Sequence, residues 1–231
     1  MTLQNISTMV KDKSIKENEH KKRALNILQI LSQTKRKTML GEFQEKKLPA
    51  FQMLIATILS ARAKDETTMP ISRTLFKKYS TAEKLAKAKP DDVKRIIRKI
   101  GFFNNKTKSI IACAQMLLDE YDRKVPDTME ELLKLPGVGR KVAGCVLVYG
   151  FNQDAIPVDT HVHRISNRLG LVNTTNPEKT EFALMKLYSQ KYWRLINDTL
   201  VHHGKTICKP IGPKCTQCLI QKLCHKKGVK K

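Results

Sequence analysis

Four cysteines close together near the C-terminal end of the sequence have the clearest capacity for chemistry. Their spacing is C-x6-C-x2-C-x5-C. Four thiolates in so short a segment can surround a soft metal centre, either an iron–sulfur cluster or a zinc ion. Disulfides are the alternative, but they are typical of secreted chains, and the first ten residues lack the charged start and apolar stretch of a secretory signal. The pattern therefore predicts a metal centre held by Cys208, Cys215, Cys218 and Cys224.

A second candidate site lies in the segment LPGVGRK at 135–141. Pro136 should end a short helix over 127–135, because proline lacks an amide N–H and clashes with the preceding turn. The two glycines permit backbone angles closed to other residues and let a phosphate approach the bare backbone. Amides at the start of the next helix would complete an anion site. With its basic pair, the segment favours a DNA-binding helix–hairpin–helix at 127–150 over an ordinary linker. Its candidate contact residues are Gly137, Gly139 and Arg140.

Lys141 falls in the first turn of the second helix of this hairpin. The positive end of the helix dipole and the neighbouring Arg140 both disfavour its ammonium form. A neutral lysine amine can act as a nucleophile. From spacing alone, a lysine that contacts a phosphate is the simpler interpretation.

Asp159, in the segment VDTH at 158–161, stands where the N-cap of a helix belongs. Its carboxylate could accept hydrogen bonds from the following amides, worth about 1 kcal/mol. That structural role would explain Asp159 without catalysis, although it also places a hydrogen-bonded carboxylate at a helix start. His161 and His163 are better interpreted as packing or phosphate-contacting groups than as metal ligands, because no third ligand has suitable spacing.

Apolar residues recur with the period of an α-helix through most of the chain. Such stripes occur at 51–59, 93–100 and 110–121, and capping boxes occur at 80–83 and 128–131. Alternating runs of period two are almost absent. The sequence therefore predicts an all-α protein of about ten helices. Within it, Cys113 and Cys145 have apolar neighbours and should be inert core residues.

The charge of the chain is strongly positive. Lysine and arginine number 44 against 21 aspartates and glutamates, a formal net charge of +23 that is spread along the sequence. A chain this basic is attracted to polyanions, with nucleic acid the leading partner and a membrane surface the second. No apolar run is long enough for a spanning helix, so we expect no membrane segment and an intracellular protein, cytoplasmic if prokaryotic. Residues 1–20 are expected to form a flexible basic arm, either solvated or in contact with DNA.

These motifs together resemble the endonuclease III family of base-excision repair DNA glycosylases. The resemblance covers roughly residues 25–225. It is carried by the hairpin LPGVGRK (135–141), the catalytic aspartate segment VDTH (158–161), the [4Fe–4S] loop with its four cysteines, and two further loops, LSARAKD (59–65) and IGFFNNK (100–106).

The resemblance implies a two-domain, helix–hairpin–helix glycosylase fold. A helical barrel would run over 44–156. The second domain would be discontinuous, joining 21–43 to 157–231, and would hold the [4Fe–4S] cluster. The catalytic cleft would lie between the domains, with Lys141 on one side and Asp159 on the other.

The resemblance also implies a chemistry and a partner. A damaged nucleotide in double-stranded DNA would flip into the cleft, Lys141 would attack the sugar C1′ and displace the base, and Asp159 would stabilise positive charge on the sugar. The resulting Schiff base would activate the sugar for β-elimination at the abasic site. The chain would then be a monomeric, bifunctional glycosylase and AP lyase acting on oxidised or otherwise damaged pyrimidines.

Two loops complete the expected DNA contacts. Arg62 stands where the family often has glutamine, and would fill the gap left by the flipped base. Ile100 and Phe102 would form a wedge in the base stack. The alternative is that they are core residues, and for Ile100, which lies on a helical stripe, the two interpretations are equally supported. In the cluster loop, Lys209 and Lys214 would contact phosphates.

Two other functions compete with this one. A non-enzymatic helix–hairpin–helix protein with a structural zinc would satisfy the composition and the hairpin, but not the pairing of Lys141 with Asp159. A monofunctional mismatch glycosylase of the same superfamily would carry another residue in place of Lys141. An RNA-binding factor is disfavoured, since no stacking sheet or aromatic motif is present.

Overall fold

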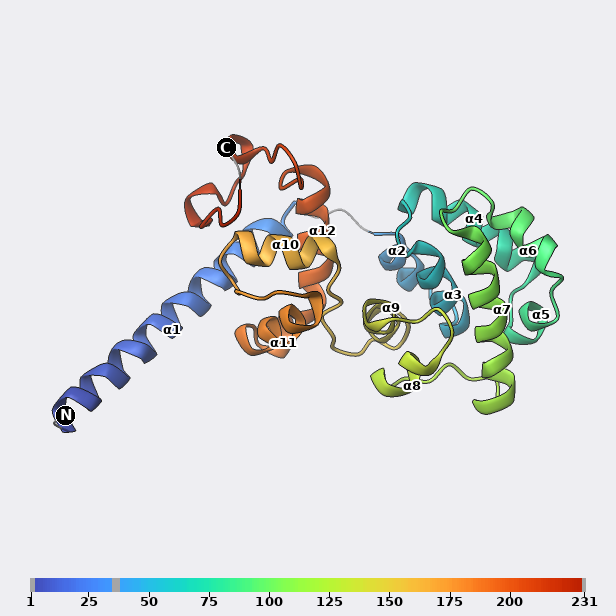
Figure 1. Cartoon of the computed structure of the whole chain (residues 1–231), viewed down its shortest axis with the longest axis horizontal. Helices are drawn as coiled ribbons and strands as arrows, with labels where there is room; N and C mark the ends of the chain where they lie inside the picture. Colours follow the sequence, from blue (N-terminus) through green and yellow to red (C-terminus); the bar gives the residue numbers. More distant parts are fainter. Residues whose placement is uncertain (1–2, 35–37, 230–231) are drawn as a thin grey trace. The chain divides into compact units, whose positions relative to one another are not determined.

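The structure is a computed structural model of the chain; it describes the backbone of residues 3–34 and 38–229, and within these ranges the side chains from residue 15 onward. Every regular element in these ranges is helical, which confirms the all-α prediction (Figure 1). The α-helices are α1 (Leu3–Ser32), α2 (Met39–Glu45), α3 (Ala50–Ser60), α4 (Asp65–Lys78), α5 (Ala82–Ala86), α6 (Pro90–Ile97), α7 (Phe103–Glu120), α8 (Met129–Lys134), α9 (Arg140–Cys145), α10 (Thr160–Arg168), α11 (Pro177–Leu187) and α12 (Trp193–Thr206). Four short helical turns are η1 (Val146–Gly150), η2 (Gln190–Tyr192), η3 (Cys215–Gln217) and η4 (Gln221–Leu223).

The chain divides into two compact units. One unit comprises Lys37–Pro157 and contains α2 to α9. The other joins Met1–Arg36 to Val158–Lys231, so the N-terminal helix packs with the C-terminal third of the chain. The hairpin therefore belongs to the first unit, and the four cysteines to the second.

Helix α3 forms the centre of the unit 37–157. All its residues from Met53 to Leu59 are buried, and so is Phe51. A helix that is apolar on every side must be surrounded by other elements, and α3 packs against α2, α4, α7, α9 and η1. Val93 and Ile97 of α6 enter the same core. The predicted stripe at 51–59 thus lies in the central helix α3, and the stripes at 93–100 and 110–121 contribute buried residues to the same core.

The two predicted capping boxes have different outcomes. Thr128 caps α8 as predicted, with its hydroxyl oxygen accepting a hydrogen bond from the Glu131 amide at 3.3 Å. Ser80 does not cap α5; the cap is Thr81, whose hydroxyl accepts from the Lys84 amide at 3.4 Å. Ser80 matches the capping-box pattern through Glu83, but the hydroxyl that caps the helix belongs to the next residue, Thr81, so the pattern misplaced this helix start by one position.

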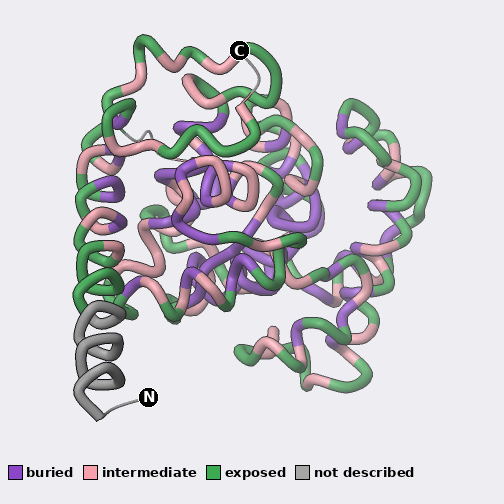
Figure 2. Tube along the Cα trace, turned by 60° about the vertical axis from the view of Figure 1, so that its left-hand side comes forward, coloured by how far each residue is buried: buried purple, intermediate pink, exposed green. Residues whose placement is uncertain are grey.

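Helix α1 packs on the second unit through one face. The residues Ala24, Ile27, Leu28 and Leu31 are buried and have helical spacing. Figure 2 shows the buried positions along one side of this helix and exposed positions along the other. The predicted arm at 1–20 belongs to this helix from Leu3 onward. Residues 1–2 and the side chains of 3–14 lie outside the described part of the chain.

Arg23 attaches α1 to two other segments of its unit. Its guanidinium donates hydrogen bonds to the carbonyl oxygens of Leu169 (2.9 Å), Gly170 (2.8 Å) and Leu223 (2.8 Å). The first two acceptors follow α10, and the third lies in the cysteine loop. The half-buried guanidinium of Arg23 thus ties α1, the segment after α10 and the cysteine loop together.

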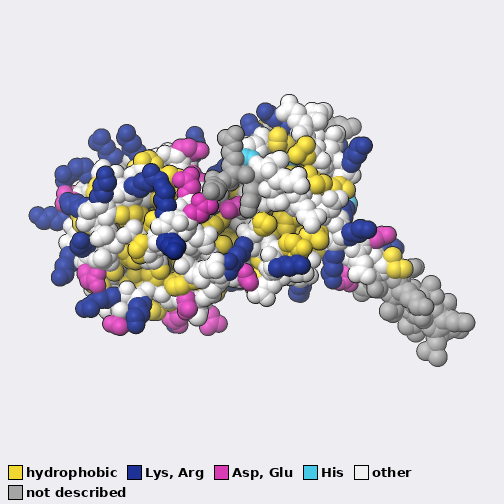
Figure 3. All heavy atoms as spheres, turned by 180° about the vertical axis from the view of Figure 1, so that it is seen from behind, with side chains coloured by type: hydrophobic (Ala, Val, Ile, Leu, Met, Phe, Trp, Pro, Cys, Tyr) yellow, Lys and Arg dark blue, Asp and Glu magenta, His cyan; other side chains and the backbone are white. Residues whose placement is uncertain are grey.

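The surface of the chain is rich in lysine and arginine. Figure 3 shows these side chains spread over one face, with acidic side chains between them. No helix in the described ranges is long and apolar enough to cross a membrane.

Candidate active site and metal centre

The hairpin between α8 and α9 depends on Gly137. Its φ is +82°, and a Cβ there would lie 2.7 Å from the Cβ of Ser109, so a larger residue would be both strained and obstructed. Gly139 differs from the expectation: its φ of −98° is open to any residue. However, a Cβ at Gly139 would meet no atom within 4 Å, so the glycine leaves open space beside the backbone. That space would admit a phosphate to the backbone of the hairpin, as the sequence predicts.

Lys141 lies in the first turn of α9, half-buried, beside the half-buried Arg140. The following residues Val142 and Ala143 are buried in the core of the unit, which fixes this end of the helix. The amine is therefore presented by a rigid element, as a nucleophile requires.

Asp159 is the N-cap of α10. Its Oδ1 accepts hydrogen bonds from the amides of His161 (2.8 Å) and Val162 (2.9 Å), which fixes the direction of the carboxylate. Its Oδ2 takes part in neither bond. The capping role and a chemical role can therefore coexist, since one oxygen holds the helix and the other is not engaged by it.

The two histidines after Asp159 make local contacts. The Nδ1 of His163 lies 2.6 Å from the Thr180 hydroxyl. The Nδ1 of His161 lies 3.2 Å from a guanidinium nitrogen of Arg164, and the ring packs against Gly204, where a Cβ would come within 2.6 Å of Nδ1. These contacts agree with the expected packing roles.

The two loops expected to contact DNA meet at Arg62 and Phe102. Both residues have left-handed backbone conformations, with φ of +54° and +59°, and both are exposed, Phe102 to 62%. The guanidinium carbon of Arg62 lies 6.0 Å from the centre of the Phe102 ring, within cation–π range. Ile100 is only 1% exposed. Of the two roles left open for Ile100, its burial favours the core.

Lys106 is a functional candidate that the sequence interpretation missed. It is 7% exposed, and burial lowers the pKa of its amine to about 8. Its Nζ donates hydrogen bonds to the carbonyl oxygens of Leu59 and Ala61, both at 2.7 Å. The available signal was its register, because Lys106 falls in line with the buried residues Ile110 and Cys113 of α7.

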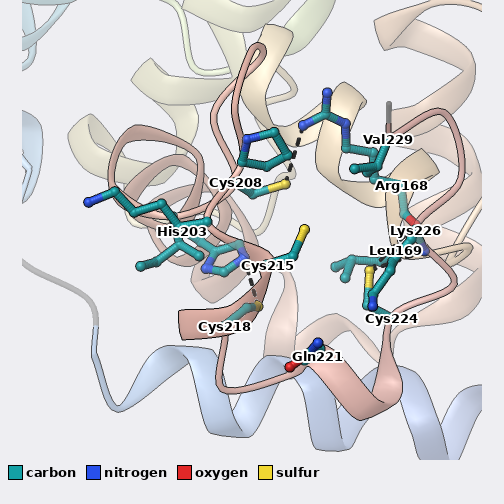
Figure 4. Close-up of a pocket in the computed structure, with 13 residues that line it drawn as sticks. Arg168, Leu169, His203, Cys208, Cys215, Cys218, Gln221, Cys224, Lys226 and Val229 are labelled. Atoms are coloured by element: carbon teal, nitrogen blue, oxygen red, sulfur yellow. Dashed lines mark hydrogen bonds between the residues drawn. The ribbon is translucent and has the colours of Figure 1, made fainter. Parts of the chain in front are cut away.

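The four cysteines line a single cavity. Figure 4 shows their sulfur atoms arranged around a shared space, together with Arg168 and His203. The cavity is formed by the end of α10, the end of α12 and the loop that follows. Cys113 and Cys145 are buried elsewhere, as expected, and burial raises the pKa of the Cys113 thiol to about 12. The sequence motif and the fold therefore separate four ligand candidates from two core thiols.

Burial and neighbouring polar groups both act on the thiols that line the cavity. Burial raises the pKa values of the Cys218 and Cys224 thiols, so their thiolates are disfavoured unless positive charge is nearby. A guanidinium nitrogen of Arg168 lies 3.6 Å from the Cys208 sulfur, and His203 Nε2 lies 3.8 Å from the Cys218 sulfur. Hydrogen bonds to cysteine sulfurs are among the interactions that tune the reduction potentials of iron–sulfur centres.

The loop between Cys208 and Cys215 is held by its backbone. Arg168 donates to the carbonyl oxygens of Lys209 (2.7 Å) and Pro210 (2.8 Å). The side chains of Lys209 and Lys214 are exposed and make no hydrogen bond or ion pair with the described residues. The loop therefore presents two cations on a fixed backbone.

We expect both cations to contact phosphates. Replacing Lys209 or Lys214 by alanine should lower the salt slope of log K for DNA binding by about 0.9 each, because each phosphate contact releases condensed counterions. Titrations of each variant with salt, on one lesion duplex and one undamaged duplex, measure this slope. The visible absorption expected from the metal centre should stay unchanged, because neither lysine is one of its candidate ligands. An unaltered slope in both variants would show that the loop faces solvent in the complex.

Comparison with known proteins agrees with this geometry. The model of the HhH-GPD superfamily of base excision DNA repair proteins matches residues 55–190. Endonuclease III of Thermotoga maritima is 48% identical over 180 residues, which cover 78% of this chain and 84% of the relative. The chain belongs to the endonuclease III family. It is a base-excision repair DNA glycosylase, and AP lyase activity is typical of its family.

Solved structures extend the comparison. A trapped endonuclease III–DNA covalent intermediate matches with a TM-score of 0.80 and 31% identity, covering 89% of this chain and 96% of the other. A thermostable thymine-DNA glycosylase matches with a TM-score of 0.78 and 25% identity, covering 90% and 97%. The fold is thus shared with a thymine-DNA glycosylase.

Proposed function

We propose that this endonuclease III family member is a bifunctional glycosylase and AP lyase that uses Lys141 as its nucleophile and Asp159 as its charge-stabilising carboxylate. Two observations carry the proposal: Lys141 presents an amine in the first turn of α9, and Asp159 holds a carboxylate at the start of α10. The similarity to an endonuclease III trapped covalently on DNA supports it.

The chemistry follows from the two groups. With the damaged nucleotide flipped out of the duplex, the neutral amine of Lys141 forms a bond to the sugar C1′ as the bond to the base breaks. The carboxylate of Asp159 stabilises the positive charge that develops on the sugar. Ring opening leaves an iminium between lysine and sugar, which acidifies the neighbouring carbon. Loss of that proton then expels the 3′ phosphate and cuts the strand.

Double-stranded DNA with a damaged pyrimidine or an abasic site is the proposed substrate, and the enzyme is proposed to act as a monomer. The DNA contacts would come from Arg140 and the open backbone at Gly139 in the hairpin, from Arg62 and Phe102, and from the basic loop. A panel of duplexes, each with one lesion, tests this proposal. Cleavage and borohydride trapping should occur on oxidised pyrimidines and abasic sites, and cleavage confined to mismatches would contradict it.

A monofunctional mismatch glycosylase is the second candidate, favoured by the structural match to a thymine-DNA glycosylase. Such an enzyme would use water as its nucleophile and would stop at the abasic site. Lys141 distinguishes the two functions, because a water-using enzyme needs no amine there. A product that retains an intact strand after base removal would support the monofunctional candidate.

We propose that the four cysteines hold a [4Fe–4S] cluster and not a zinc ion. A zinc ion binds each thiolate at about 2.3 Å and so requires four sulfurs in close contact. The four thiols instead surround a shared cavity, which suits a larger centre with one cysteine for each iron. Its role would be to fix the basic loop.

Cys218→Ser should remove the cluster and loosen the loop. We expect loss of the yellow-brown visible absorption, loss of bound iron, and a lower melting temperature for the unit that contains α10 and α12, because metal binding contributes to folding. Metal analysis and thermal unfolding measure these changes. Cys113→Ser, at a buried thiol outside the cavity, is the control and should retain iron. Zinc in the purified wild-type protein would contradict the proposed cluster.

A further inference from the structure

Lys106 forms two bonds that close the end of helix α3. Its Nζ donates to the carbonyl oxygens of Leu59 and Ala61, and both distances are 2.7 Å. Leu59 lies in the last turn of α3 and Ala61 is its C-cap, at the end where a helix leaves acceptors without intrahelical donors and where a cation is favoured. The next residue along the chain is Arg62, in a left-handed conformation. Lys106 thus fixes the backbone from which Arg62 projects.

The backbone of Lys106 performs a second task. Its amide donates to the carbonyl oxygen of Phe102 at 3.0 Å, the first hydrogen bond of α7. Phe102 is the N-cap of that helix, in a left-handed conformation and without a side-chain cap. One residue therefore holds both loops, and the guanidinium of Arg62 lies over the ring of Phe102.

A purely structural explanation does not account for the identity of this residue. A buried lysine amine is expensive to desolvate, and burial lowers its pKa to about 8. A short polar residue could cap the helix at lower cost, whereas the long lysine reaches from α7 to the loop of Arg62. The two residues held by Lys106 are exposed and strained, which is unusual for parts of a scaffold and typical of binding elements.

We propose that Lys106 is a positioning residue that holds Arg62 and Phe102 as one element for probing the base stack, and so sets the preference for a lesion over undamaged duplex. This inference rests on the proposed function of those two residues. Lys106 itself is buried beneath the loops and contributes no phosphate contact of its own.

The first experiment compares Lys106→Met with Lys108→Met in the full chain. The methionine keeps the length and apolar stem of lysine but leaves two buried carbonyls without their donor. We expect the ratio of dissociation constants for undamaged and abasic-analogue duplexes to fall about tenfold or more, with binding to undamaged DNA nearly unchanged. Lys108 lies on the same helix, is exposed, and should leave the ratio unchanged.

A spectroscopic measurement separates positioning from general loss of stability. The fluorescence of 2-aminopurine opposite the abasic analogue reports how far the orphan base is unstacked. It should fall in the Lys106→Met complex at saturating protein, although the protein remains folded by circular dichroism. Should this variant fail to fold, Lys106→Arg carries the same test, because the longer side chain displaces the donors and with them the loop of Arg62. Unchanged fluorescence and an unchanged ratio in a folded Lys106 variant would overturn the inference.

Combined variants complete the test. Arg62→Ala and Phe102→Ala should each lower the lesion preference. Adding Lys106→Met to the variant that carries both alanines should lower it little further, because the effects of residues that act together are not additive. No effect of Arg62→Ala and Phe102→Ala would overturn their proposed role in DNA binding as well as the inference. An effect of both, combined with a full additional loss from Lys106→Met, would overturn only the inference.

Discussion

Replacement of Lys141 by glutamine will abolish the covalent trapping of this enzyme on lesion DNA by borohydride. Trapping reduces an iminium that requires a primary amine on the protein, and an amide cannot form it. Base removal should fall on the order of 10⁴-fold, the scale of losing a catalytic nucleophile. The measurement is denaturing electrophoresis of the trapped complex together with single-turnover excision on the same duplex.

The matched control for this variant is Lys134→Gln on α8 in the same hairpin. Lys134 is exposed and pairs with Glu131 at 2.6 Å, an interaction worth little at a surface. Trapping should be retained in this control. Undiminished trapping in the Lys141 variant itself would assign the iminium to another amine and remove the nucleophile from the proposed mechanism.

Replacement of Asp159 by asparagine should separate its two roles. Asparagine is as good an N-cap as aspartate, and it can still accept the hydrogen bonds from the His161 and Val162 amides. Only the negative charge is lost, so the free energy of unfolding should change by less than about 1 kcal/mol. Base excision should fall about 10²- to 10³-fold, as when a group aimed at developing charge is removed.

Two measurements decide between capping and catalysis at Asp159. Thermal unfolding measures the contribution of the N-cap to stability, and single-turnover excision measures the contribution of the negative charge to base removal. Asn176→Ala provides the comparison, since the Asn176 carboxamide caps α11 by accepting from the Lys179 amide at 2.8 Å. That variant should lose stability and retain excision. An Asp159→Asn protein that unfolds readily while its folded fraction stays fully active would leave only the capping role.

The features of this chain that could be predicted from its sequence are those that depend on residues close together in the sequence. The Thr128 cap, the buried stripes and the N-cap position of Asp159 each depend on contacts within a few residues, and patterns of period and spacing detect them. Ser80 and Thr81 show the limit of such patterns, because Ser80 matches the capping box with Glu83 and yet Thr81 caps the helix.

The features that could not be predicted depend on contacts distant in the sequence. Lys106 was not recognised, since a lysine in a helix is normally scored as exposed and its two acceptors lie 47 and 45 residues away. Arg23 is similar, with an acceptor 200 residues along the chain. The open space at Gly139 was expected, but its ordinary backbone angle was not, because spacing carries no information on φ.

The attachment of α1 to the end of the chain has a consequence for biosynthesis. The unit 37–157 is continuous, so a ribosome completes it before it makes the segment from residue 158 onward. The other unit cannot be completed until later, because the surface on which α1 packs includes Leu223, next to Cys224. Contacts across such long loops are slow to form, and domains generally fold as they emerge. Helix α1 is therefore made before its partner surface and remains undocked until the segment that carries Leu223 has emerged, so the docking of α1 and the insertion of the proposed cluster should be late, coupled steps in the maturation of this enzyme.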